Sequence, residues 1–300
     1  MSGQDSLIAA QHEGRRRFLD LVADLRPELH RYCARMTGSV ADGEDIVQET
    51  LARAYYLLPE MDEVPAFRPW LFRIAHNRAL DHLRRYEARM SEPLEAVQDS
   101  AADPAPDPGD AIAHQQAVQA AVSRFVELAP AQRSCVILKD VLGHSLEEIG
   151  GLLELSVPAV KAALYRGRVR LRELAEAPRP AAPPRQTSPA VARYVALFNA
   201  RDWDGVRAML AEDVQLDLVS LAQRAGRAVG NYLTNYDRYH DWRLAPAWLE
   251  GREVIAVFRA PGDARPGYFI ELTMRNGKVR FIRDFRYVPY VMQDAAVALV

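Results

Sequence analysis

The residues best suited by type and spacing to contact a nucleic acid lie in one short segment, residues 145–172. Between positions 161 and 172 the sequence holds five lysines and arginines and no acidic residue. Such cations on one helix can contact DNA phosphates, while the first residues of that helix can reach base edges in the major groove. A helical hairpin with a solvated basic face would show the same run of charge. The segment is therefore a candidate DNA-binding element whose role depends on its surroundings.

Two capping signals divide this segment into two helices. Ser145 with Glu148 three residues later predicts a capping box, and Ser156 followed by Pro158 predicts the start of a second helix. Two short helices joined by a tight turn form a helix-turn-helix, whose second helix enters the major groove. The candidates for base contacts are Pro158, Ala159, Lys161, Ala162 and Tyr165, and the candidates for phosphate contacts are Arg166, Arg168 and Arg172.

A second set of polar and aromatic candidates lies on two helices expected at residues 42–58 and 67–85. The first helix places Asp45, Gln48, Glu49 and Arg53 on its polar face. The second helix carries the aromatic side chains of Phe67 and Trp70 at its start and a polar stripe of Arg73, Asn77, Asp81, Arg84 and Arg85. Taken alone, these aromatic residues could belong to a core and the arginines to a solvated surface.

Two proline-rich stretches organise the chain into three modules. Residues 93–110 hold four prolines, several acids and no cation, and residues 178–189 hold five prolines. Such compositions do not build a core and are typical of tethers. The expected division is a helical module at 10–92, an acidic linker at 93–114, the helix-turn-helix module at 115–177, a second linker at 178–188 and a third module at 189–300.

The composition of the chain says more about the cellular compartment of the protein than about its function. The net charge of -2 hides a local separation of acidic and basic segments, so it does not exclude DNA binding. Cys33 and Cys135 fall in different modules, which favours free thiols in a reducing cytoplasm. No stretch approaches the apolar length of a membrane span, and the polar start does not resemble a signal peptide. A cytoplasmic protein without a membrane partner is expected.

Residues 10–177 resemble the extracytoplasmic-function sigma factors, small promoter-recognition subunits of bacterial RNA polymerase. The resemblance rests on three motifs in the family order: DGEDIVQETLARAY is similar to region 2.2, FRPWLFRIAHNRALDHLRR to regions 2.3 and 2.4, and SLEEIGGLLELSVPAVKAALYRGRVRLREL to region 4.2. It implies two all-α domains, region 2 and region 4.

The resemblance also implies a role for each candidate group. The face formed by Asp45, Gln48, Glu49 and Arg53 would bind core RNA polymerase. Phe67 and Trp70 would stack on the opened strand of the -10 element, Asn77 would contact a flipped base, and Arg73, Arg84 and Arg85 would contact its backbone. Region 4 would bind the -35 element. Ala162 and Ala163 leave few side chains for bidentate base contacts, so the promoter sequence cannot be assigned.

The third module is expected to be α+β. Helical spacing precedes an alternating strand at Val214, Leu216 and Leu218, and Asn276-Gly277 predicts a tight hairpin turn. The stretch VARYVALFNARDWDGVRAMLAEDVQLDL is similar to SnoaL-like (nuclear-transport-factor-like) domains, in which a curved sheet forms a cone around a pocket. The candidates for that pocket are Asp217, Tyr232, Tyr236, Trp248 and Asp284.

Together these features predict a sigma factor that is not an enzyme, with no catalytic residue, metal or cofactor, whose C-terminal domain modulates its activity in cis. Its expected partners are core RNA polymerase and promoter DNA, and the resemblance leaves open an anti-sigma factor and a small-molecule ligand of the C-terminal domain. The alternatives are an isomerase- or cyclase-type enzyme or ligand sensor fused to a DNA-binding module, and a plain helix-turn-helix repressor.

Overall fold

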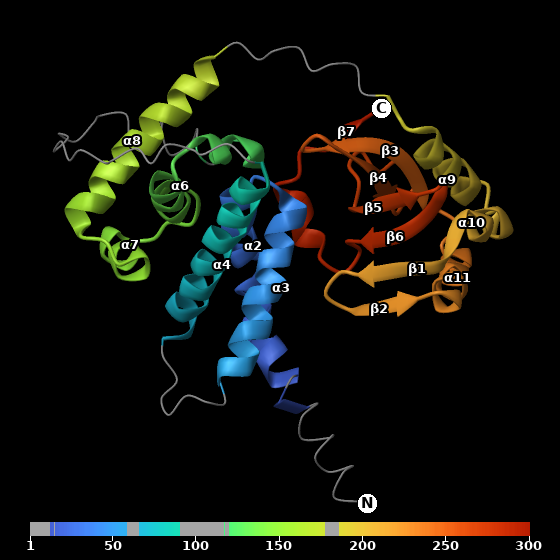
Figure 1. Ribbon diagram of the computed structural model, residues 1–300, viewed down its shortest axis with the longest axis horizontal. Helices are drawn as coiled ribbons and strands as arrows, with labels where there is room; N and C mark the ends of the chain where they lie inside the picture. The colour runs from blue at the N-terminus through green and yellow to red at the C-terminus, as the bar shows by residue number, and fades with distance from the viewer. Residues whose placement is uncertain (1–12, 15, 59–65, 91–116, 118–119, 178–185) are drawn as a thin grey trace, which may run out of the picture. The chain divides into compact units, whose positions relative to one another are not determined.

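A computed structural model describes residues 13–14, 16–58, 66–90, 117, 120–177 and 186–300. The predicted acidic linker, residues 93–114, lies entirely outside these described residues. The chain divides into two compact units, residues 1–178 (unit 1) and 179–300 (unit 2), each with a core of its own (Figure 1). Within the described ranges, no helix combines the length and apolar character needed to cross a membrane.

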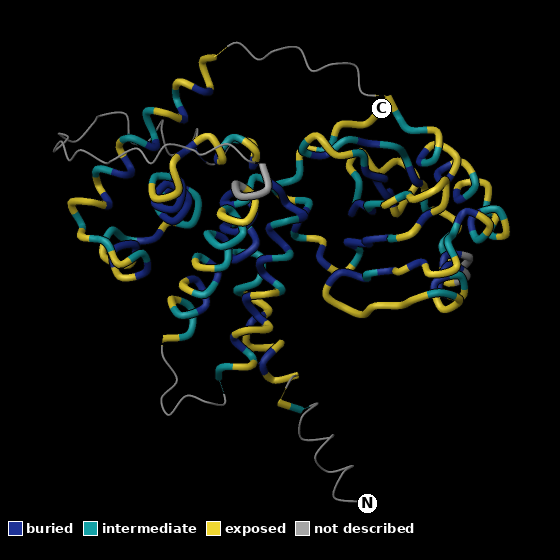
Figure 2. The backbone as a smooth tube through the Cα atoms, in the orientation of Figure 1, coloured by how far each residue is buried: buried dark blue, intermediate teal, exposed yellow. Residues whose placement is uncertain are grey.

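Unit 1 is helical, as the sequence predicts. Its labelled helices are α2 (Arg26–Thr37), α3 (Val40–Leu57), α4 (Phe67–Met90), the 3₁₀ helix η2 (Val122–Glu127), α6 (Pro130–Val136), the π-helical turn η3 (Ile137–Val141), α7 (Leu146–Leu153) and α8 (Val157–Glu176). Helices α3, α4, α7 and α8 carry buried residues on one side and exposed residues on the other, whereas α2 and η3 have no exposed residue (Figure 2). The amphipathic pattern of the sequence therefore matches how the helices pack.

Glycines allow two helix pairs in unit 1 to approach closely. A Cβ atom at Gly43 in α3 would lie 2.5 Å from the Cα of Ala34 in α2. A Cβ atom at Gly167 in α8 would lie 2.7 Å from Cγ2 of Val136 in α6. Only glycine leaves room for these contacts, so α3 packs closely against α2, and α8 packs closely against α6.

The capping box predicted at the start of α7 is present. The amide of Glu148 donates to Oγ of Ser145 at 3.1 Å, and the amide of Ser145 donates to Oε2 of Glu148 at 2.7 Å. This pair satisfies two amides at a helix end that have no partner within the helix.

Replacing Ser145 by alanine is expected to lower the free energy of unfolding of unit 1 by about 1 kcal/mol. The reason is that the amide of Glu148 at the start of α7 loses the side-chain oxygen that caps it. Urea unfolding followed by circular dichroism measures the change. Glu147→Gln is the matched control, since Glu147 is exposed beside the box, and it should shift stability by less than about 0.5 kcal/mol. Equal effects of both substitutions would contradict a specific capping role.

Unit 2 is α+β, also as predicted. Its helices are α9 (Pro189–Asn199), α10 (Trp203–Met209), α11 (Arg227–Leu233) and the 3₁₀ helices η4 (Thr234–Arg238) and η5 (Pro289–Gln293). Its strands are β1 (Leu210–Leu218), β2 (Ala222–Ala225), β3 (Arg243–Leu249), β4 (Arg252–Phe258), β5 (Tyr268–Arg275), β6 (Lys278–Asp284) and β7 (Ala298–Leu299). They form one mixed sheet in the order β2-β1-β6-β5-β4-β3-β7, in which β1 and β6 run parallel.

One face of this sheet packs against the helices of unit 2. Val214, Leu216, Ile255 and Ile270 share a buried cluster with apolar residues of α9, α10 and α11. The predicted hairpin joins β5 to β6 through Asn276 and Gly277, both with positive φ. The sheet face toward the helices is called the inner face below.

Candidate nucleic-acid interface

The helix-turn-helix is formed by α7, a short turn and α8. Glu154 ends α7 in the left-handed conformation, with φ at 59°, and Oγ of Ser156 accepts the amide of Ala159 at the start of α8. A Cβ atom at Gly150 would lie 2.8 Å from the carbonyl oxygen of Leu155, so glycine is required where the turn folds back on α7. These local features fix the direction in which α8 leaves the turn.

The first turns of α8 present the predicted base-contacting side chains. Pro158, Ala159, Lys161 and Tyr165 are exposed, and Ala162 is partly exposed. The opposite side of α8 is buried through Val160, Leu164, Gly167 and Leu171. This arrangement leaves one face of α8 accessible to a DNA groove.

The predicted phosphate contacts lie in three different environments. Arg168 makes a two-bond ion pair with Asp140 of η3, at 2.9 and 2.7 Å, and both side chains are largely buried. That guanidinium therefore holds α8 against η3. Arg166 lies beside a pocket, and Arg172 is partly exposed.

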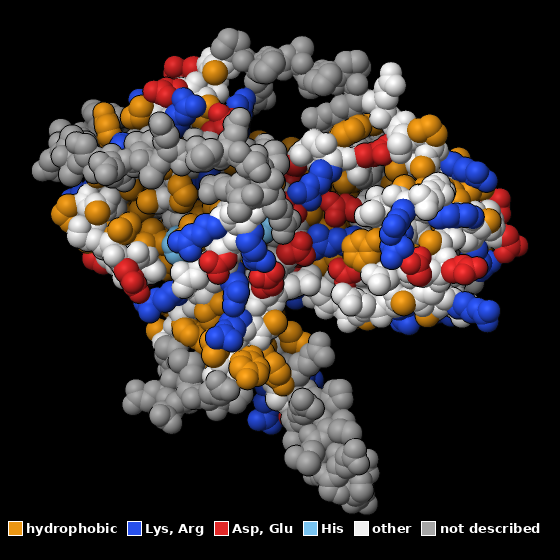
Figure 3. All heavy atoms as spheres, viewed as in Figure 1, with side chains coloured by type: hydrophobic (Ala, Val, Ile, Leu, Met, Phe, Trp, Pro, Cys, Tyr) orange, Lys and Arg blue, Asp and Glu red, His pale blue; other side chains and the backbone are white. Residues whose placement is uncertain are grey.

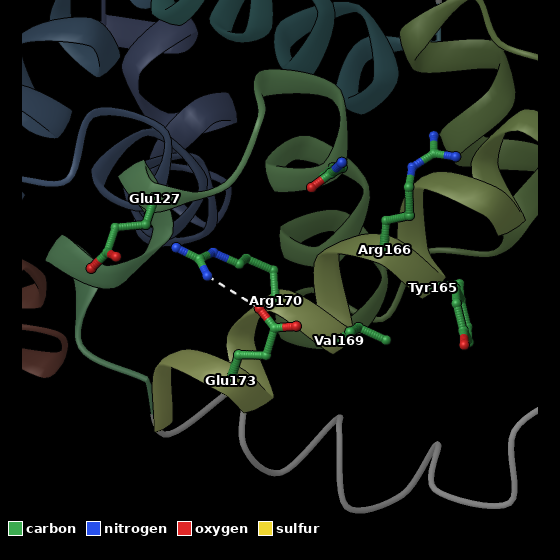
Figure 4. A pocket seen from close by; sticks show the side chains of 7 residues that line it. Glu127, Tyr165, Arg166, Val169, Arg170 and Glu173 are labelled. Atoms are coloured by element: carbon green, nitrogen blue, oxygen red, sulfur yellow. Dashed lines mark hydrogen bonds and ion pairs between the residues drawn. The ribbon is translucent and has the colours of Figure 1, made fainter. Parts of the chain in front are cut away.

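The pocket lies along the flank of α8 and has a volume of about 360 Å³ (Figure 4). Its lining consists of Glu127, Gln132, Tyr165, Arg166, Val169, Arg170 and Glu173. Arg170 donates to Glu173 at 3.1 Å, so part of the positive charge on this flank is compensated. The sequence pattern did not indicate this pocket, because its wall includes residues of η2 and α6.

The predicted polymerase-binding face lies on α3. Glu49 and Arg53 are exposed, and Asp45 and Gln48 are partly exposed on the same side of the helix. Sequence reasoning missed the acidic residue beside them: Glu44 is fully buried and forms an ion pair with Arg26 at 2.6 Å. Glu44 stands in the acidic run Asp42-Gly43-Glu44-Asp45, which is typical of a helix start, so the sequence gives no signal of a buried partner.

The predicted -10 contacts lie on α4. Arg73, Asn77, Arg84 and Arg85 are exposed, whereas Phe67 and Trp70 are half-buried with ring centroids 5.9 Å apart. The aromatic pair packs partly against the core of unit 1. Arg73 donates to the carbonyl oxygen of Gly151 in α7 at 3.1 Å, a partner that was not expected.

His76 lies between the exposed and buried sides of α4. Its Nδ1 atom is 2.8 Å from the hydroxyl oxygen of Tyr32 in α2 and 3.5 Å from Oγ of Ser134 in α6. Burial lowers the pKa of His76 to about 4, because a charged imidazole would lose its hydration there. At neutral pH this side chain is therefore uncharged.

Three of the five pocket candidates of unit 2 come together on the inner face of the sheet. The hydroxyl of Tyr236 donates to Oδ2 of Asp284 at 2.7 Å, and the amide of Arg286 donates to Oδ1 at 2.9 Å. The ring of Tyr232 lies edge-on to that of Tyr236, with centroids 5.9 Å apart. Burial raises the pKa of Asp284 to about 6.

The other two pocket candidates do not join this group of side chains. Asp217 is on the opposite face of the sheet from Leu216 and Leu218, with Oδ2 at 3.7 Å from Nε of Arg283. Trp248 lies near the end of β3, opposite Glu253 of β4 in the strand register. Because Asp217 and Asp284 occupy opposite faces, the two carboxyl groups cannot act together on one substrate.

The buried Asp284 should make the stability of unit 2 depend on pH. Its pKa is raised in the folded state, so the folded state binds the proton more tightly, and stability is lost as pH rises. The free energy of unfolding should fall by about 2 kcal/mol between pH 4 and pH 6. Urea unfolding in a Trp70→Phe background, which leaves tryptophans only in unit 2, measures this slope.

The variant Asp284→Asn should lose most of that pH dependence, because the amide does not titrate. Asp263→Asn is the control, since Asp263 is an exposed loop acid whose carboxylate accepts the amides of Arg259 and Ala260. An unchanged slope in Asp284→Asn would show that other groups cause it.

Charge on unit 2 is mixed. Figure 3 shows basic and acidic side chains interspersed over the visible face of this unit. This face lacks the one-sided positive field that favours nucleic acid. The candidate DNA contacts proposed from the sequence all lie on α4 and α8 of unit 1.

Comparisons with known proteins identify the two helical modules of unit 1. The family model for sigma-70 region 2 matches residues 21–89, and the model for sigma-70 region 4 matches residues 119–171. The ECF RNA polymerase sigma factor SigG of Mycobacterium tuberculosis is 34% identical over 239 residues, which cover 67% of this chain and 62% of SigG. The chain thus spans less than two thirds of the length of that relative.

Two further matches cover most of the known protein. The ECF RNA polymerase sigma factor SigW of Bacillus subtilis is 32% identical over 164 residues, 52% of this chain and 87% of SigW. The crystal structure of the extracytoplasmic function sigma factor SigJ of Mycobacterium tuberculosis matches 89% of this chain and 95% of its own, with 24% identity and a TM-score of 0.36. On the sequence evidence, this chain belongs to the extracytoplasmic-function RNA polymerase sigma factors.

Proposed function

We propose that the protein directs transcription initiation as a sigma subunit of RNA polymerase, with α4 contacting the -10 element and α8 contacting the -35 element. The observation that carries the proposal is that one chain of this family presents two separate exposed polar surfaces, one on each helix. A helix-turn-helix repressor would need only the second of these surfaces. The polymerase would bind the face of α3 that holds Glu49 and Arg53.

The chemistry of α4 supports contact with an opened strand. Asn77 offers both a donor and an acceptor on an exposed surface, and Arg84 and Arg85 lie further along the same helix. Half-buried aromatic rings at Phe67 and Trp70 provide flat surfaces on which unpaired bases can stack. Such a surface suits single-stranded DNA better than an intact duplex.

Transcription in vitro with purified core RNA polymerase tests the proposal. Footprinting should show protection at the -10 and -35 elements only when the core enzyme is present. Asn77→Ala should abolish opening of the -10 element while leaving core binding intact, and Arg31→Ala, a partly exposed residue of α2, should leave opening unchanged. Tight duplex binding without polymerase would instead support the repressor alternative.

We also propose that unit 2 modulates this activity in cis, in the cytoplasm where RNA polymerase acts. Its separate core and its buried Asp284–Tyr236 pair support a domain with a ligand-binding or signalling role of its own. A chain truncated after Glu176 should show altered transcription with core polymerase. Identical activity of the truncated and full chains at every promoter would contradict modulation in cis.

A further inference from the structure

Side chains from four strands meet at one end of the sheet in unit 2 (Figure 1). Trp242 directly precedes β3, Arg259 directly follows β4, Tyr268 begins β5, and Arg286 lies two residues after β6. The antiparallel pairing of β3 with β4, of β4 with β5 and of β5 with β6 places these four positions at the same end. These four residues are called the arginine–aromatic cluster below.

Both guanidinium groups of the cluster lie against the same indole ring. Cζ of Arg286 is 4.6 Å from the ring centroid of Trp242, and Cζ of Arg259 is 5.9 Å from it. The guanidinium of Arg259 also lies 5.1 Å from the ring of Tyr268, and that of Arg286 lies 4.9 Å from the ring of Tyr239. Aromatic faces attract a cation but do not neutralise its charge. Two positive charges therefore lie close together.

Within the part of the chain that the structure describes, neither of these guanidinium groups forms an ion pair. Arg286 donates to the hydroxyl of Tyr239 at 3.0 Å, and Arg259 donates to the carbonyl oxygen of Arg286 at 3.2 Å, so both acceptors are uncharged. The carboxylate of Asp263 accepts the backbone amide of Arg259, at 3.0 Å, and not its guanidinium. Because a guanidinium carries five N–H donors, each group still has donors available for a ligand.

The interior behind the two guanidinium groups does not balance their charge. The one carboxylate buried there belongs to Asp284, and its two oxygens already accept the hydroxyl of Tyr236 and the amide of Arg286. The hydroxyl of Tyr268 is buried and has no hydrogen-bond partner among the described residues. Native proteins rarely leave such a group unpaired, and water or a ligand can complete it. The excess of positive charge and the unpaired hydroxyl both indicate a negatively charged, oxygen-bearing ligand.

The rings around the guanidinium groups favour a ligand with a flat apolar body. Tyr287 is 41% exposed, and its ring centroid is 5.5 Å from Cζ of Arg286. Trp242 is partly exposed and stacks on Tyr239 with centroids 4.4 Å apart. Such rings can pack against an aromatic ligand, while a planar guanidinium binds a carboxylate through two parallel hydrogen bonds. Both features match an aromatic carboxylate.

The loop that carries Tyr239 and Trp242 is held in place by Arg201, which lies between α9 and α10. Nη2 of Arg201 donates to the carbonyl oxygens of Tyr239, His240 and Trp242, at 3.1, 2.8 and 2.8 Å. These bonds fix the backbone beneath the two rings. A site whose parts are fixed before the ligand arrives loses less conformational entropy on binding.

We infer that the arginine–aromatic cluster binds a small aromatic carboxylate. The carboxylate of the ligand lies between Arg259 and Arg286, and its ring packs against Trp242 and Tyr287. The inference deepens the proposed role of unit 2 and rests on it, because it names the class of ligand to which that unit would respond.

Fluorine NMR with 4-fluorobenzoate as the probe tests the site in the full chain, without core polymerase. The wild-type chain should bind the probe with a Kd below about 1 mM at low ionic strength, a reasonable affinity for so small a ligand. Benzoate should displace the probe at least about fivefold more effectively than inorganic phosphate or cyclohexanecarboxylate, which has the same charge but no aromatic ring. Equal displacement by all three would overturn the assignment of an aromatic carboxylate, and absence of binding up to about 10 mM probe would overturn the site.

The variant Arg259→Ala should weaken binding of the probe at least about tenfold, because the ligand loses a charge-assisted hydrogen bond. Arg275→Ala is the matched control, since Arg275 is exposed at the opposite end of β5 and its removal changes the net charge equally. Arg286→Ala should act like Arg259→Ala where circular dichroism shows that it is folded. The exposed Arg259 carries the test by itself if Arg286→Ala does not fold. Equal weakening by Arg259→Ala and Arg275→Ala would reveal only a general attraction of anions and would overturn the site.

Comparing probe binding with transcription by the chain truncated after Glu176 separates this inference from the proposed function. Binding of the probe by the full chain, with no effect of the truncation on transcription, would keep the site and refute modulation in cis. An effect of the truncation, with no binding of the probe, would keep modulation in cis and refute the site. If both hold, benzoate should change transcription by the wild-type chain and leave transcription by Arg259→Ala unchanged, and equal responses of the two would overturn the site.

Discussion

Replacing Arg168 by alanine is expected to destabilise unit 1 by about 3 to 5 kcal/mol, because it leaves the buried carboxylate of Asp140 without its ionic partner. Asp140 is only 2% exposed in its side chain, so water cannot replace the two lost hydrogen bonds. Chemical unfolding followed by circular dichroism measures the loss. A residue that only contacted phosphate would affect DNA binding and leave stability within about 0.5 kcal/mol.

Two controls separate these roles. Lys161→Ala removes an exposed cation of α8 and should leave the free energy of unfolding nearly unchanged, while it weakens DNA binding and lowers its salt dependence. The double variant Asp140→Ala/Arg168→Ala should be more stable than Arg168→Ala, since no buried charge is left unpaired. If Arg168→Ala and Lys161→Ala had equal stability, the structural role of Arg168 would be wrong.

Arg168 also shows what the sequence could and could not predict. The position of α8, its capping by Ser156 and its buried stripe follow from local spacing, and all three are confirmed. The partner of Arg168 lies 28 residues earlier in the chain, in η3. No local pattern distinguishes a cation that faces solvent from one that faces a distant acid.

The same limit applies to unit 2. Alternation along β1 and the Asn276-Gly277 turn predict the strands and the hairpin correctly. The pocket candidates were chosen by residue type, which does not say that Asp217 and Asp284 lie on opposite faces. That assignment needs the parallel pairing of β1 with β6, in which Asp217 is paired with Arg283 and Leu218 with Asp284.

The contacts between the helices of residues 26–90 and those of residues 122–176 were not predicted at all. Each surface reads as the solvated or DNA-binding face of its own helix. The groups that join them lie far apart in the sequence, 78 residues for Arg73 and Gly151 and 97 residues for Arg133 and Met36. Only tertiary structure brings these groups together. His76 is the one residue whose position hints at such a contact. It lies between the apolar and polar faces of α4, where a histidine often has a partner on another helix, and its Nδ1 atom is 3.5 Å from Oγ of Ser134 in α6.

Acidification from pH 7.5 to pH 4.5 is expected to lower the free energy of unfolding of unit 1 by about 2.5 kcal/mol through His76 alone. The folded-state pKa is about 4, below the ordinary value of 6.5, so the unfolded chain takes up the proton first. The contribution is complete above pH 6.5 and is lost as pH falls toward 4. His144, whose pKa burial also lowers, acts in the same direction.

The variant His76→Gln isolates this effect, since it keeps a polar side chain near Tyr32 and Ser134 but does not titrate. The groups that face His76 are hydroxyls, and burial raises the pKa of Tyr32, so neither titrates in this window. The difference between the unfolding curves of wild type and His76→Gln at each pH therefore reports the imidazole. A difference that does not change with pH would contradict the buried, neutral state of His76.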